Sequence, residues 1–131
     1  LMLASLELVR RMAAGRKEDL VTREDSTFGR VARYIDRHYA EDLSIEQLAR
    51  QFYLSPYHLS HIFRQKTGYS LKQYVLRRRI GEAQMRLVNA QDSVQTISEA
   101  VGFADASYFS RIFSKYVGLT PTEYRKFRIG P

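Results

Sequence analysis

The chain of 131 residues contains no cysteine and has no hydrophobic run long enough for a membrane helix. The first absence excludes a disulfide framework and a cysteine-ligated zinc finger, and it is compatible with a reducing compartment. The second excludes a span of about eighteen apolar residues within this sequence, so we expect no membrane partner. The chain also lacks an initiating methionine. We therefore expect a fragment of a longer protein, for which a missing signal peptide carries little information.

Acidic residues are scarce in one part of the chain only. Residues 1–43 hold eight Lys/Arg and eight Asp/Glu, whereas residues 44–131 hold thirteen and six, which places the whole net charge of +7 in the second part. This asymmetry is typical of a module that binds a polyanion beside a neutral neighbour. A solvated basic surface or an anionic membrane would have the same composition.

An internal repeat occupies this basic part. Residues 43–68 align with residues 93–118 at an offset of 50 from Ser55 onward and of 49 before it. A repeat with this period indicates two copies of one supersecondary unit. The aligned pairs include Leu59 with Phe109, Ile62 with Ile112, Phe63 with Phe113 and Gly68 with Gly118.

Each copy has the pattern of a short helix, a turn and a second helix. Ser55 before Pro56 is a helix-start signal in the first copy, and Asp105 is the corresponding cap in the second. Gly102 suits a positive φ in the second turn. Two helices joined by three or four residues form a helix-turn-helix, so the sequence predicts two such units.

We call the second helix of each unit its reading helix, because its polar face is unusual. The face holds small, hydroxyl-bearing and basic residues instead of the Glu/Lys mixture of a solvated helix. Small residues allow close approach to another surface, and an arginine can bind a guanine edge bidentately. A solvated polar face explains either helix alone, but two related faces in one chain favour entry into a groove. These faces comprise Tyr57, Ser60, His61 and Arg64 in the first unit, and Ala106, Ser107, Ser110, Arg111 and Ser114 in the second.

A long helix is predicted between the units, over about residues 70–89, beginning at a capping box of Ser70 and Gln73. Such a helix would be roughly 30 Å long, close to the roughly 34 Å between successive major grooves on one face of DNA. Gly81 counts against its rigidity unless close packing requires a glycine. Three consecutive arginines, residues 77–79, fan around the helix, and we expect some of them to contact phosphate.

The ends of the chain are less specific. Residues 1–14 have helical apolar spacing, which fits the last helix of an upstream domain or a dimer contact, and polar residues 15–26 suit a linker. A new helical pattern starts at Phe28. A closing helix is expected over about residues 120–128, with Tyr124 and Phe127 facing inward and basic residues at its end that complement its dipole.

Two stretches carry a resemblance to a known family. ISEAVGFADASYFSRIFSKYVGLTPTEYR resembles the C-terminal signature of the AraC/XylS family of bacterial transcription regulators, and LARQFYLSPYHLSHIFRQKTG resembles the family's first helix-turn-helix. The resemblance implies an all-α domain of seven helices over residues 28–131, with residues 1–27 as an upstream remnant and linker. It also implies binding of double-stranded DNA in adjacent major grooves, activation through RNA polymerase, a cytoplasmic bacterial protein, no cofactor, and a possible homodimer through the upstream domain.

The resemblance also predicts the residues that touch DNA. Base contacts carried over from the family are Tyr57, Ser60, His61, Ala106, Ser107, Ser110 and Arg111. We expect phosphate contacts from Ser55, Arg64, Lys66, Arg77, Arg78, Lys115 and Thr120.

Ser98 and Ala106 depart from the family pattern. Ser98 stands where the family commonly has alanine, and we expect its hydroxyl to bond to the preceding helical turn. Ala106 can offer only a methyl group, so the second unit would depend on Arg111.

His58 and His61 lack an acidic or third histidine partner nearby, so neither a metal site nor an enzyme is predicted. An RNA-binding domain fits less well, because the A-form major groove is deep and narrow, and a protein-interaction module stays open.

Overall fold

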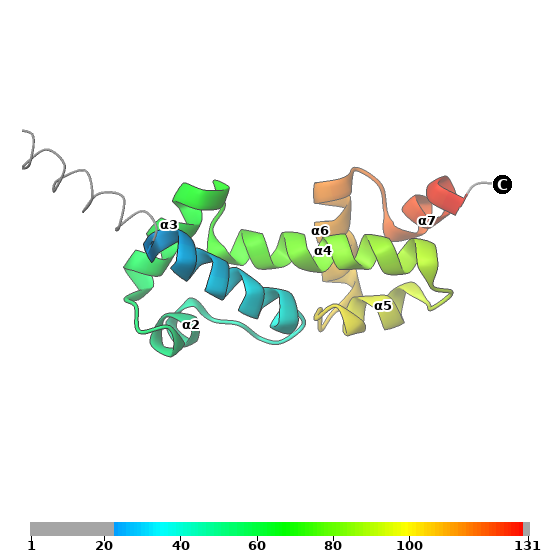
Figure 1. Cartoon of the computed structure of the whole chain (residues 1–131). Helices are drawn as coiled ribbons and strands as arrows, with labels where there is room; N and C mark the ends of the chain where they lie inside the picture. The colour runs from blue at the N-terminus through cyan, green and yellow to red at the C-terminus, as the bar shows by residue number, and fades with distance from the viewer. Residues whose placement is uncertain (1–22, 130–131) are drawn as a thin grey trace, which may run out of the picture.

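The computed structural model describes residues 23–129, and within them the fold has seven helices and no strand (Figure 1). The first helix covers residues 23–38. It is followed by α2 (Ile45–Gln51), α3 (Pro56–Thr67), α4 (Leu71–Asn89), α5 (Val94–Ala100), α6 (Ala106–Val117) and α7 (Pro121–Ile129). The all-α prediction of two helix-turn-helix units joined by a long helix is confirmed. The helical segment expected over residues 1–14 lies outside the described residues.

One boundary differs from the expectation. Residues 23–27 are helical, although their polar composition predicted a linker up to Phe28. Contacts with α3 explain the difference, because Asp25 pairs with Lys66 and Glu24 lies 4.0 Å from the His58 side chain. Composition alone does not reveal tertiary contacts of this kind.

Two hydrophobic cores lie along α4, one for each unit. The first joins the helix 23–38, α2, α3 and the start of α4, where Leu71 and Val75 are buried. The second joins α5, α6 and the later part of α4, where Ile80, Ala83 and Leu87 are buried. In Figure 1, α4 runs along the middle of the molecule, with α3 beside its start, α6 crossing it, and α2 and α5 lower in the view. The long helix therefore contributes to both cores.

Side-chain caps define the helix starts predicted from the sequence. Ser55 Oγ accepts a hydrogen bond from the His58 backbone N–H at 3.0 Å, which satisfies a donor left free at the start of α3. Ser70 and Gln73 form the complete capping box of α4. Left-handed glycines end α3 and α6, at Gly68 with φ 78° and Gly118 with φ 88°.

The turn of each unit has one residue with a left-handed backbone conformation, but the residue type differs. Gly102 has φ 105°, as predicted, whereas the equivalent position of the first unit is Tyr53, with φ 57°. Gly102 also packs tightly, since a Cβ there would lie 2.7 Å from the Ala40 carbonyl oxygen. The turn of the second unit thus rests on the segment that follows the helix 23–38.

The closing helix is present, but only one of the two residues predicted to face inward does so. Tyr124 packs against the second core, whereas Phe127 is 74% exposed. Only the first half of α7 packs, since Pro121 is buried and residues 126–129 are all exposed. Arg125 is not simply a complement to its own helix, because it donates hydrogen bonds to Leu87 O at 2.9 Å and Ala90 O at 3.2 Å, at the end of α4.

Candidate nucleic-acid interface

The reading helix of the first unit, α3, buries one face and exposes the predicted one. Leu59, Ile62 and Phe63 are buried. Tyr57 is 81% exposed, and its ring stacks nearly parallel to that of His61, with centroids 6.3 Å apart. Tyr57, His61 and Arg64 are all exposed on α3, where they can contact bases, sugars or phosphates, while the predicted Ser60 is only partly exposed.

The reading helix of the second unit, α6, repeats this arrangement with smaller side chains. Asp105 caps it, with Oδ1 accepting from the Ser107 N–H at 2.8 Å, and Phe109 and Phe113 are buried. Ser107 and Arg111 are exposed, whereas the remaining predicted base contacts, Ala106 and Ser110, are partly buried. The Arg111 guanidinium lies 5.8 Å from the centre of the Tyr108 ring, so it is a cation at the surface with an aromatic neighbour.

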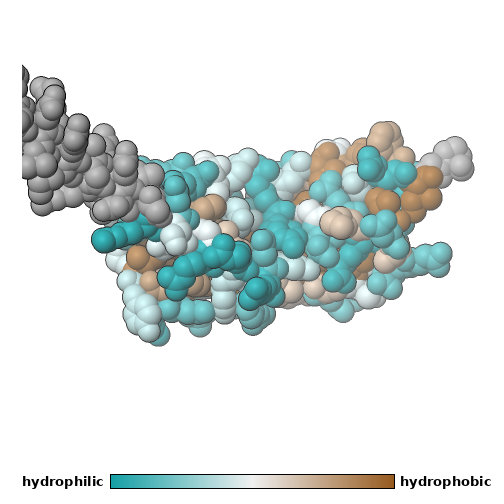
Figure 2. All heavy atoms as spheres, in the orientation of Figure 1, coloured by the Kyte–Doolittle hydropathy of each residue, from teal (hydrophilic) through white to brown (hydrophobic). Residues whose placement is uncertain are grey.

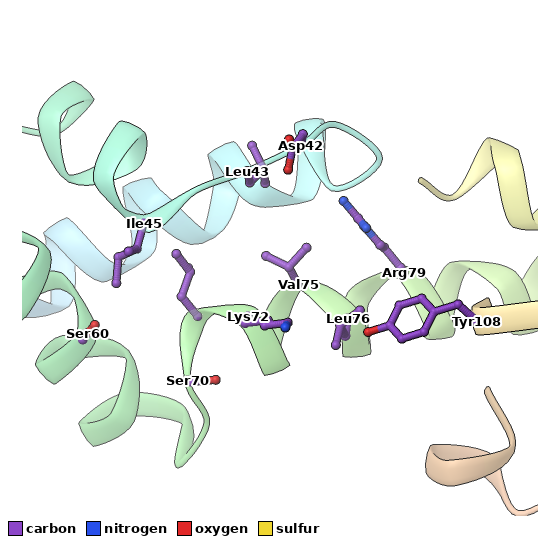
Figure 3. Close-up of a pocket in the computed structure, with 11 residues that line it drawn as sticks. Asp42, Leu43, Ile45, Ser60, Ser70, Lys72, Val75, Leu76, Arg79 and Tyr108 are labelled. Carbon is purple, nitrogen blue, oxygen red and sulfur yellow. The ribbon is translucent and has the colours of Figure 1, made fainter. Parts of the chain in front are cut away.

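Both reading helices border one cleft along α4, with a volume of about 480 Å³. Ser60 lines it from α3 and Tyr108 lines it from α6. Figure 3 shows Tyr108 pointing toward Leu76 on α4 and Arg79 pointing toward Asp42. The cleft therefore lies along α4 between the two reading helices. Its other lining residues are Leu43, Ile45, Ser70, Leu71, Lys72 and Val75.

Four of the predicted phosphate contacts lie at the ends of the reading helices or beside them. Ser55 and Thr120 are exposed capping residues, and Thr120 forms a full box with Glu123. The hydrogen bonds from Thr120 lower the pKa of the Glu123 carboxyl. Arg64 and Lys115 are exposed near the ends of α3 and α6. A fifth candidate, Lys66, is paired with Asp25.

The three consecutive arginines of α4, residues 77–79, contact the protein itself, and the sequence did not predict these contacts. Arg78 pairs with Asp36 at 3.0 Å and with Glu82 at 3.4 Å. Burial by itself lowers the pKa of Arg78, but hydrogen bonds and charge from both carboxylates outweigh it and raise the pKa. A phosphate contact by Arg78 would compete with these ion pairs.

Arg77 and Arg79 are engaged as well. The Arg77 guanidinium lies over the rings of Tyr69, at 4.1 Å, and Tyr116, at 4.7 Å. Arg79 donates hydrogen bonds to two carbonyl oxygens of residues that follow the helix 23–38, and its burial lowers its pKa. Aromatic residues after Gly68 and near the end of α6 were the available sequence signal for the Arg77 contact, but their proximity depends on the fold.

Two further expectations concern single residues. Ser98 is fully buried, and its hydroxyl has no hydrogen-bond partner among the residues that the structure describes, so the expected bond to the preceding turn is absent. The expectation that His58 has no acidic neighbour is wrong, because Glu24 Oε1 lies 4.0 Å from its Nε2 on the first helix, which the sequence did not place beside α3. Residues 23–129 contain no group of three side chains suited to a metal ion. In the same residues no helix is long and apolar enough to cross a membrane.

The view in Figure 2 shows mostly hydrophilic residues over the helix 23–38 and α4, with hydrophobic residues gathered at the end of the molecule that carries α7. This distribution agrees with the exposed side chains of Phe127 and Ile129.

Comparisons with known proteins agree with this geometry. A family described as a helix-turn-helix domain matches residues 48–126. The arabinose operon regulatory protein of Salmonella typhimurium is 38% identical over 119 residues, which cover 90% of this chain and 42% of that protein. The first curated relatives that match are covered over 35% to 44% of their lengths, so the chain spans less than half of each.

Two solved structures are similar in fold. The C-terminal domain of AraT, a response regulator from Geobacillus stearothermophilus, matches with a TM-score of 0.76 and 30% identity over 80% of this chain and 88% of that one. The DNA-binding domain of AdpA, solved in complex with a target DNA, matches with a TM-score of 0.72 and 26% identity over 76% of this chain and 89% of that one. The chain therefore belongs to the AraC/XylS family of transcription regulators and contains its DNA-binding helix-turn-helix domain.

Proposed function

We propose that this domain binds a specific sequence of double-stranded DNA, with α3 and α6 in adjacent major grooves, and that it regulates transcription as part of a longer protein. One observation carries the proposal: two equivalent reading helices, each with a polar exposed face, border the same cleft along α4. The net charge of +7 favours a polyanionic partner. The fold shared with AdpA, whose DNA-binding domain was solved with a target DNA, supports DNA as that partner.

Within this proposal, different residues of the two units contact bases and phosphates. Exposed Tyr57, His61, Ser107 and Arg111 contact base edges, and the half-buried Ser60, Ala106 and Ser110 set how closely the helices approach. Arg64, Lys66, Lys115 and the capping hydroxyls of Ser55 and Thr120 contact phosphates, which supplies affinity and register without sequence information.

Three wider features also belong to the proposal. The relatives that match include operon regulators, so we propose activation through contact with RNA polymerase in the bacterial cytoplasm, where the chromosome lies. We also propose that the segment upstream of residue 28 joins the domain to a sensing or dimerising part. No cofactor is needed for DNA binding of this type.

Selection of bound duplexes from a random DNA pool, followed by sequencing, tests the proposal. Two short motifs with centres about ten base pairs apart are expected, because that spacing places both on one face of DNA. A single motif would mean that one unit reads bases while the other holds phosphate. No enrichment at any salt concentration would refute sequence-specific binding by this chain, and would favour a protein-interaction module.

A further inference from the structure

The relative position of the two units depends on more than the rigidity of α4. The first core uses Leu71 and Val75 of this helix, and the second uses residues from Ile80 onward. Gly81 lies where the second core begins, and a Cβ there would meet no atom within 4 Å, so close packing does not explain this glycine. A glycine inside a helix makes the helix easier to distort. Contacts between the units must therefore help to fix their angle.

The Arg77 side chain forms one such contact, because it lies between tyrosines that belong to different units. Its guanidinium is 4.1 Å from the Tyr69 ring centre and 4.7 Å from the Tyr116 ring centre. Both distances are well inside the range of a cation–π interaction. We call this set of three residues the Tyr69–Arg77–Tyr116 clasp.

Each tyrosine of the clasp is tied to its own unit. Tyr69 follows the end of α3, and its backbone N–H donates to Thr67 Oγ1 at 3.0 Å, while that hydroxyl donates to Phe63 O at 2.7 Å. Tyr116 lies on α6 and packs against the second core. A shift of one unit relative to the other would therefore pull one ring away from the guanidinium.

Arg79 braces the units on the opposite side of α4, since two residues along a helix are about 200° apart. It donates to Tyr39 O at 2.6 Å and Glu41 O at 2.7 Å, and it lies 5.7 Å from the Phe103 ring centre in the second unit's turn. This brace is partly buried and includes the close approach of Gly102 to Ala40. The clasp is the more exposed of the two, and its Tyr69 and Arg77 are exposed, so these two residues can be changed without opening a core.

We propose that Arg77 is a positioning residue whose clasp sets the angle between the reading helices, and thereby the spacing between the two DNA motifs that the domain accepts. The inference rests on the proposed function. It differs from the role expected from the sequence, in which Arg77 contacts phosphate. One added base pair turns the second motif by about 34° and moves it by about 3.4 Å, so a fixed angle discriminates between spacings.

The two roles of Arg77 predict different results. If the guanidinium holds the units together, Arg77→Ala weakens discrimination between spacings and leaves binding to one isolated motif unchanged. If it contacts phosphate, Arg77→Ala weakens binding to every spacing equally and lowers the slope of log K against log salt by about one. Tyr69→Ala separates the roles further, because it breaks the clasp and removes no charge.

The test uses the 131-residue chain and duplexes that carry the selected motifs at the preferred spacing, one base pair shorter and one base pair longer. We expect the ratio of dissociation constants between wrong and preferred spacing to fall about tenfold in Arg77→Ala, the size of two lost cation–π contacts. Tyr69→Ala removes one of the two contacts and should lower the ratio about threefold, and Tyr69→Phe, which keeps the ring, should retain it. Arg37→Ala, an exposed arginine on the helix 23–38, serves as the charge-matched control.

Circular dichroism and urea unfolding show whether each variant folds. An unchanged ratio in a folded Arg77→Ala or Tyr69→Ala protein would overturn the inference, as would a uniform loss of affinity with a lower salt slope in Arg77→Ala. If the unaltered chain selects two motifs at fixed spacing, either result leaves the proposed function intact. If the unaltered chain selects no motif, the proposed function fails, and the inference fails with it.

Discussion

Gly102 combines two requirements that only glycine meets. Its φ of 105° is strained for any other residue, and a Cβ would lie 2.7 Å from a backbone oxygen of Ala40. We therefore expect Gly102→Ala to lower the free energy of unfolding by about 2 kcal/mol or more, as measured by urea denaturation. Gly118→Ala is the matched control, because Gly118 has φ 88° but no atom within 4 Å of an added Cβ. An equal loss in both variants would show that the contact with Ala40 contributes nothing.

Ser98 is the one buried polar residue of the described cores, and its hydroxyl lacks a partner there. A buried unpaired hydroxyl costs about 1–3 kcal/mol. The equivalent residue of the first unit is Ala49, which is equally buried. We expect Ser98→Ala to raise the free energy of unfolding by about 1 kcal/mol, with the reverse change, Ala49→Ser, lowering it. A loss of stability in Ser98→Ala would mean that the hydroxyl is satisfied in solution.

Arg111 is the cation best placed to read a base from α6. It is exposed, with its guanidinium 5.8 Å from the Tyr108 ring, so its removal should leave folding unchanged. We expect Arg111→Ala to cost about 1–3 kcal/mol of binding free energy and to relax base choice at one position, as seen by repeating the selection. Arg111→Lys keeps the charge but loses the planar fork, so it should also relax that position. Uniform weakening over all sequences would instead assign Arg111 to phosphate.

At the scale of the element, α4 carries a glycine that its surroundings do not require. A Cβ at Gly81 meets no atom within 4 Å, and alanine is the better helix former by about 1 kcal/mol. We expect Gly81→Ala to raise the free energy of unfolding by about 0.5–1 kcal/mol, measured by the urea midpoint at constant m-value. A decrease would show that α4 needs a distortion at this position that alanine resists.

At the scale of the whole molecule, the positive charge divides into exposed cations and cations that are paired with carboxylates. Lys115 is exposed in the last turn of the reading helix α6, whereas Arg78 is paired with Asp36 and Glu82. We therefore expect Lys115→Ala to lower the slope of log K against log salt by about one, and Arg78→Ala to leave it unchanged. Binding isotherms at several salt concentrations measure both slopes. A lower slope in Arg78→Ala would mean that DNA displaces its carboxylate partners.

The sequence by itself determined the repeat, the two helix-turn-helix units, the long helix between them and the caps at Ser55, Ser70 and Asp105. These features depend on spacing and on local hydrogen bonds, and both can be deduced from neighbouring residues. The exposed faces of α3 and α6 followed as well, because a helix that buries Leu59 or Phe109 must expose the opposite side. The DNA contacts assigned to those faces stay predictions.

Only the tertiary structure decided which residues distant in the sequence contact one another. The ion pair of Asp25 with Lys66 belongs to a helix that polar composition did not predict, and the exposed position of Phe127 follows from where α7 leaves the core. Arg77 stacks between tyrosines that lie 8 residues before it and 39 after it in the chain. Such contacts depend on the angle between the two units along α4. The local sequence of each unit does not determine this angle.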